Sequence, residues 1–197
     1  MKPNSTMRVV LAVVLSISLF ATGCSAQWIS VALADLPVLT EMALNIATLV
    51  ATLQSGKQLS AADATAMQNI SAEASRDLNL LETLYKQYKA SPSTEGLQKI
   101  EDAIATINTN LPALLTVAHI SDATLSARIT AAVNLILTTV TSFASLIPET
   151  AAPSLARKAK KIAIPHASDL KKQWNLQVCG PTGRAALDAA FSVCGVR

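Results

Sequence analysis

The chain has 197 residues, of which 51% are hydrophobic, 4% aromatic and 15% charged, and it carries a formal net charge of +3. Scarce aromatic residues and only six glycines, beside abundant Ala and Thr, favour closely packed helices and argue against a β-sandwich or a barrel. The charge is uneven: residues 24–149 hold six basic and eleven acidic side chains, whereas residues 150–197 hold eight and two, so the body is mildly acidic and the tail basic.

The first two dozen residues have the order of parts of a secretory signal. Lys2 and Arg8 precede the apolar run Val9–Phe20, which ends on Ala21-Thr22-Gly23-Cys24. The run is shorter than the roughly 20 residues of an ordinary membrane-spanning helix. Because Cys24 directly follows Gly23, the segment resembles the signal peptide and lipobox of bacterial lipoproteins. The alternative is an uncleaved anchor, since no further charge occurs before Asp35.

The resemblance implies a compartment and an attachment. In that class the peptide is cut before the Cys, so residues 1–23 would be removed and Cys24 would carry lipid, palmitate included. Ser25 follows Cys24 and is not Asp, which within the family points to the outer membrane, on the side facing the periplasm. The resemblance ends there, and no family is identified for the mature domain.

Residues 24–34 are expected to form a membrane-proximal tether, in which Trp28 would lie at the membrane interface. Asp35 is a plausible N-cap, with Pro37 tolerated in the first turn that follows. Apolar residues at helical spacing then predict a first helix to about Gln54. An alternative is an earlier start near Gln27 with a kink at Pro37.

Three more helices are expected within residues 60–147. The first opens on Ser60-Ala61-Ala62-Asp63, which resembles a capping box, and the next follows Ser91-Pro92 and is expected to kink at Pro112. Ser121 would cap the last, which Pro148 closes. Short turns force neighbouring helices together, so the sequence predicts an all-α fold in which residues 35–148 form an up-down-up-down four-helix bundle. The alternative is a three-helix bundle with the first helix on the membrane.

The last of these helices lies in a long uncharged stretch between Arg128 and Glu149, and a hydropathy scan could assign it to a membrane. At 100° per residue its apolar and hydroxyl side chains separate onto two faces, which a bundle helix needs and a spanning helix does not. Its polar face, with Asn134, Thr138 and Thr141, is either plain surface or covered by the tail or a partner.

Residues 149–197 are predicted to form a basic helical tail. Its charges cluster at Arg157, Lys158, Lys160 and Lys161, which would meet anionic lipid, the acidic bundle or an acidic envelope partner, or else form a solvated helix face. Nucleic acid is excluded by the exported location and the lack of interleaved aromatic residues. The bundle order returns the chain to the end where it began, so the tail is expected beside the membrane.

Cys179 and Cys194 remain as an even pair once Cys24 is assigned to lipid. In an oxidising compartment such a pair predicts a disulfide, worth about 3 kcal/mol in the chain-entropy model. Two reduced, buried cysteines are the alternative.

The sequence contains few of the residue patterns that are typical of a catalytic site. His119 and His166 are the only histidines, and neither accompanies a nucleophile elbow. No metal or haem spacing occurs, and the acidic pair Glu73/Asp77 is interpreted as a solvated face. We therefore expect no enzyme, no metal and no cofactor, but a lipid-anchored bundle with a binding or structural role. The alternatives are a carrier holding a small apolar ligand in a cavity near Pro37 and Pro112, and an envelope hydrolase using either histidine.

Overall fold

A computed structural model describes the backbone of residues 5–147 and 166–196, and side chains in those ranges from Trp28 onward. The described chain is helical, with six helices and no strands. Arg157, Lys158, Lys160 and Lys161 lie outside the described residues, so the predictions for the basic segment stay predictions.

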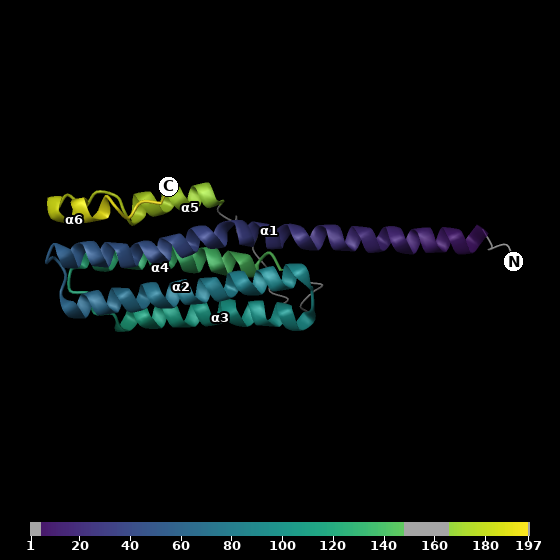
Figure 1. Ribbon diagram of the computed structural model, residues 1–197, viewed down its shortest axis with the longest axis horizontal. Helices are drawn as coiled ribbons and strands as arrows, with labels where there is room; N and C mark the ends of the chain where they lie inside the picture. Colours follow the sequence, from purple (N-terminus) through teal and green to yellow (C-terminus); the bar gives the residue numbers. More distant parts are fainter. Residues whose placement is uncertain (1–4, 148–165, 197) are drawn as a thin grey trace.

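The first helix is longer than expected. Helix α1 (Ser5–Ser55) runs without interruption through Cys24 and through Pro37, and its N-terminal part projects beyond the other helices (Figure 1). The predicted tether is therefore wrong for residues 28–34, which are helical and include buried Ile29 and Ala32. Pro37 is exposed, so its ring is kept out of the packed face, and burial of the apolar stripe on both sides of it outweighs the local cost of Pro in a helix.

Three helices follow, each begun by a capping side chain. They are α2 (Ala61–Ala90), α3 (Thr94–Val117, containing Pro112) and α4 (Ala123–Ala144). Ser60 accepts a hydrogen bond from the Asp63 amide at 3.0 Å, and Asp122, one residue after the predicted cap, accepts from the amides of Thr124 and Leu125. These caps satisfy amides that have no partner inside the helix.

Asp63 does not complete a capping box. Its Oδ1 atom instead accepts hydrogen bonds from the amide of Ser121 at 3.1 Å and from the Ser121 hydroxyl at 3.3 Å. The side chain is buried, and so the start of α2 is tied to the turn between α3 and α4.

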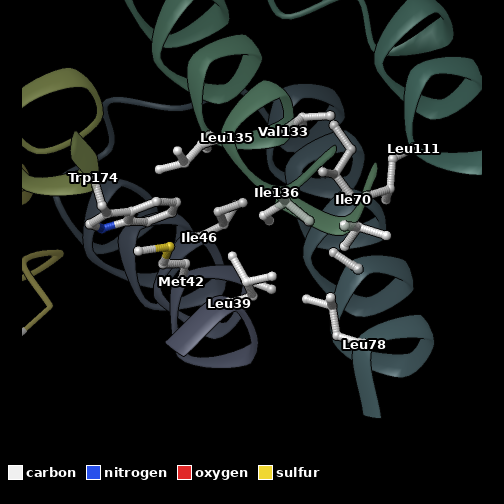
Figure 2. Packing of buried hydrophobic residues seen from close by; sticks show 14 of the residues in the cluster. Leu39, Met42, Ile46, Ile70, Leu78, Leu111, Val133, Leu135, Ile136 and Trp174 are labelled. Atoms are coloured by element: carbon white, nitrogen blue, oxygen red, sulfur yellow. The ribbon is translucent and has the colours of Figure 1, made fainter. Parts of the chain in front are cut away.

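Helix α1 packs against α2, α2 against α3, and α3 against α4, while α4 also contacts α1. The buried side chains form one hydrophobic cluster that includes residues from the C-terminal tail. Figure 2 shows its middle, where side chains of four helices meet Trp174 of the tail: Leu39, Met42, Ile46, Ile70, Leu78, Leu111, Val133, Leu135 and Ile136. The part of α1 from Trp28 onward, together with α2, α3 and α4, is called the helical body below.

The tail comprises α5 (Ala167–Gln177) and α6 (Ala185–Phe191). Cys179 and Cys194 are joined by a disulfide, with their Cα atoms 5.8 Å apart. Trp174 is fully buried, and its Nε1 atom donates to the carbonyl of Cys194 at 2.8 Å. The same carbonyl accepts from Asn45 of α1 at 3.3 Å, so the disulfide loop, α5 and α1 meet at one point.

The described part of the tail lies away from the N-terminal end of the helical body (Figure 1). The expected position of the tail beside the membrane depends on the basic segment that begins at Arg157, which lies outside the described residues, so it stays a prediction. Helix α5 packs on α1 and α4 and α6 packs on α1, and the pair lies beside the body rather than at its N-terminal end (Figure 1). Arg184 forms an ion pair with Asp122, at the start of α4. Burial of Leu170, Trp174 and Leu187 in the shared core explains this position.

Candidate functional site

The end of the body nearest to Cys24 is closed by aromatic rings. Trp28 is only 6% exposed; its ring centroid lies 5.6 Å from that of Tyr85 and 5.9 Å from that of Tyr88. Tyr85 in turn packs edge-on against Phe143 at 6.2 Å. The prediction that Trp28 contacts the membrane interface is therefore wrong in this structure, because the indole is buried as part of the apolar stripe of α1.

Two polar atoms are buried in this aromatic cluster. Within the part of the chain that the structure describes, the indole nitrogen of Trp28 and the hydroxyl of Tyr85 have no hydrogen-bond partner. Burial holds the pKa of Tyr85 well above its ordinary value, because the phenolate would be poorly solvated there. The hydroxyl therefore stays protonated, and both rings belong to the hydrophobic cluster of buried side chains.

Both ends of α5 are held by charged side chains of the helical body. At its start, Asp35 of α1 is buried beside His166 and accepts a hydrogen bond from the Ala167 amide. Burial raises the pKa of Asp35, and the charge of His166 and the Ala167 amide oppose that rise. The prediction that Asp35 is the N-cap of the helix to which it belongs is therefore wrong. Asp35 is instead a carboxylate at the N-terminus of α5.

At the C-terminal end of α5, Arg128 of α4 supplies a positive charge, as Asp35 supplies a carboxylate at the N-terminal end. Its guanidinium donates to the carbonyls of Gln177 at 2.6 Å and of Pro181 at 3.0 Å, and it lies 5.9 Å from the ring centroid of Phe191. A cation on the last carbonyls of a helix is favoured by the dipole and satisfies acceptors that lack partners. The tail is therefore built into the body.

A hollow of about 340 Å³ lies between α2 and α3. Its walls come from the two helices in nearly equal parts: Asp77, Leu80 and Leu84 from α2, and Lys99, Asp102, Ala103 and Thr106 from α3. Asp77 is 6% exposed, which corrects the prediction that this residue belongs to a solvated face. Asp77 follows Ile70 by seven residues and so shares the stripe of α2 that packs on its neighbour.

The carboxylate of Asp77 is poorly compensated. Its Oδ2 atom has no hydrogen-bond partner among the described residues, and its Oδ1 atom lies 3.7 Å from Nε of Arg76, whose guanidinium also pairs with Glu73. Burial raises the pKa of Asp77, Glu73 adds to the rise, and Arg76 opposes it. The hollow therefore contains an acidic group that nothing on the described protein fully neutralises.

A second hollow, of about 520 Å³, lies near the start of α2 and the end of α3. Its lining is mostly small and apolar: Ala61, Ala62, Thr65, Ala66, Asn69, Leu114, Val117 and Ala118. It contains no charged side chain, and Val117 at its edge is largely exposed.

The remaining predicted features fall in separate places. His119 and His166 are both exposed, one after α3 and the other before α5. Among the described residues, no group of three or more His, Cys, Asp or Glu side chains is placed to hold a metal ion. Asn134, Thr138 and Thr141 are exposed, so the polar face of α4 is surface, although Thr141 donates to Asn108 of α3 at 3.1 Å.

Two described segments, Trp28–Ser55 and Ala123–Ala144, are long and apolar enough to cross a membrane by length and composition alone. About half of each apolar window is buried inside the structure. Comparison with protein-family models, with curated proteins and with solved structures found no match to this chain.

Proposed function

We propose that this protein is a lipid-anchored protein of the bacterial cell envelope, carried by lipid on Cys24 in the outer membrane and facing the periplasm. Its helical body acts by binding or by structural support, without catalysis and without a cofactor. The lipobox resemblance of Ala21-Thr22-Gly23-Cys24 supports the anchor. The contacts of consecutive helices with one another support an up-down-up-down four-helix bundle as the body.

The observation that carries the proposal is the burial of Trp28. This residue follows Cys24 by only four positions in α1, which is about 6 Å along a helix. A lipid on Cys24 would then attach almost directly to a packed body, with no flexible spacer between them. The body would stand on the membrane at a fixed height, which suits a protein that presents a surface rather than one that reaches for a distant target.

The surface available for binding is the one formed by α2 and α3. The tail occupies α1 and α4, whereas both hollows open between α2 and α3. Such concave sites with a few polar groups among apolar walls are where ligands and partner side chains bind most often.

A carrier of a small apolar ligand is the second candidate, and the second hollow favours it because its lining has no charged group. That hollow lies at the surface between α2 and α3, and neither Pro37 nor Pro112 lines it. A hydrolase has less support, since His119 and His166 are exposed on different elements.

The anchor is tested by metabolic labelling of cells with an alkyne-tagged palmitate, followed by detection on the purified protein. The wild type and the control Ser25→Ala, which keeps the Cys, are expected to carry the label in the membrane fraction, and Cys24→Ser is expected to lack it. Label that persists in Cys24→Ser, or that is missing from the wild type, would contradict the proposal.

A further inference from the structure

We propose that the hollow between α2 and α3 binds an alkylammonium group, with Asp77 as its counter-ion. This names a ligand class for the binding role proposed above and rests on that role, but not on the lipid at Cys24. The bound group would place its charged nitrogen against the carboxyl group of Asp77, which lines the hollow, and its methylene chain along the apolar walls.

The first support is the state of the Asp77 carboxylate. It is more than nine-tenths buried, yet one of its oxygens accepts no hydrogen bond from the described residues. Its neighbour Arg76 is largely exposed and is shared with Glu73. A buried charge without a full set of partners is costly and is normally removed by pairing or protonation. An incoming ammonium would supply both a charge and hydrogen-bond donors.

The second support is the charge around the hollow. Two acidic side chains (Asp77 and Asp102) and one basic side chain (Lys99) line it. The lysine nitrogen lies 2.6 Å from a carboxylate oxygen of Glu95, and so it is already engaged in an ion pair. Oδ1 of Asp102 accepts one hydrogen bond, from Gln98 at 2.9 Å, which leaves a second carboxylate on the facing wall with acceptor capacity. The balance favours a cation over an anion.

The apolar residues of the lining indicate which kind of cation the hollow would bind. Leu80, Leu84 and Ala103 provide apolar surface beside the carboxylates, and Leu80 is half exposed at the edge. A bare metal ion would gain nothing from these side chains and would need more oxygen ligands. A wholly apolar molecule would leave Asp77 unpaired. A short apolar chain that ends in an ammonium group satisfies both parts of the site, and about 340 Å³ accommodates a few methylenes.

The test uses the full chain purified in detergent micelles, with methyl groups of Leu and Ala labelled for NMR. The probes are n-butylammonium and the neutral n-butanol, which controls for partition of the chain into micelles and for purely apolar binding. We expect n-butylammonium to shift the signals of Leu80, Leu84 and Ala103 in a saturable way, and n-butanol to shift them little.

Two variants test whether the ammonium group is bound through the charge of Asp77. Asp77→Asn keeps the shape of the side chain and is expected to weaken n-butylammonium binding about tenfold or more, since one lost charge-assisted contact of 1.4 kcal/mol changes affinity tenfold. Glu82→Gln is the matched control, because Glu82 lies on the same helix, pairs with Lys86 and does not line the hollow; it is expected to bind as the wild type does. A thermal melt of each variant establishes that it is folded.

Equal binding of n-butanol and n-butylammonium would overturn the proposal, as would unchanged n-butylammonium binding by folded Asp77→Asn. Absence of binding beside normal palmitate labelling of Cys24 would overturn the ligand class and leave the anchor intact. A further arm uses Nα-acetyl-lysine methylamide, which presents the same ammonium as a partner's lysine side chain does. Its binding would identify a protein source for the group, and binding of n-butylammonium alone would identify a free amine; both outcomes support the site.

Discussion

Replacement of Trp174 by alanine tests whether the tail belongs to the folded core. Trp174 is fully buried, lies against Met42 and Ile46 of α1 (Figure 2), and donates to the carbonyl of Cys194. Truncation of a buried Trp costs about 3–5 kcal/mol through lost burial and the cavity that remains. The carbonyl keeps its hydrogen bond from Asn45, so the lost bond adds only about 1 kcal/mol. We expect a total loss of about 5 kcal/mol, a large share of the 5–15 kcal/mol typical of a domain.

The assay is urea unfolding of the full chain in detergent, followed by circular dichroism at 222 nm. Leu176→Ala is the matched control, because Leu176 lies two residues further along α5 and is 75% exposed; it should change the free energy of unfolding by less than about 0.5 kcal/mol. A loss of under about 1 kcal/mol in Trp174→Ala, with an unchanged slope against urea, would refute the assignment of the tail to the core.

Three further predictions concern the tail and the hollow. Removal of the disulfide in the double variant Cys179→Ser, Cys194→Ser should cost about 3 kcal/mol in urea unfolding, because the bond closes a loop of 15 residues; a midpoint equal to that of the wild type would contradict it. Arg128→Ala should lose about 2 kcal/mol and speed amide exchange in α5, because carbonyls at its C-terminal end lose their charged donor; unchanged exchange in α5 would speak against this capping. Asp77 has a folded-state pKa above the ordinary value of 3.8, so the folded state binds the proton more tightly and stability falls as pH rises from that value through the raised pKa. Asp77→Asn should remove this fall, so that the variant is the more stable protein at neutral pH and the difference closes below about pH 4; a thermal-melting difference that widens in acid would show the sign to be wrong.

The helices α2, α3 and α4 could be predicted from the sequence because their information is local. Apolar residues recur at three and four positions, and Ser60 and Asp122 occupy or adjoin predicted caps. Local signals misled at α1, where Asp35 and Pro37 resemble a helix start. The stripe of Trp28, Ile29 and Ala32 continues into Leu36 and Leu39 at helical spacing, and this continuity outweighs the local signals.

The position of the tail could not be predicted, because its contacts join residues far apart in the chain. Asp35 meets the start of α5, Asn45 meets Cys194, and Arg128 meets the end of α5. Asn45 and Arg128 resemble ordinary polar surface residues when only their sequence neighbours are considered. A polar residue within an apolar stripe, such as Asp35 or Asp77, is the one local sign that a distant partner or a ligand is present.

The central claim is that a lipid on Cys24 attaches directly to the packed helical body. The most direct measurement is the mass of the N-terminal proteolytic peptide of the protein extracted from membranes. We expect a peptide that begins at Cys24 and carries acyl lipid on it, followed by the segment with buried Trp28. A peptide that begins at Met1, or one that begins at Cys24 without lipid, would contradict it.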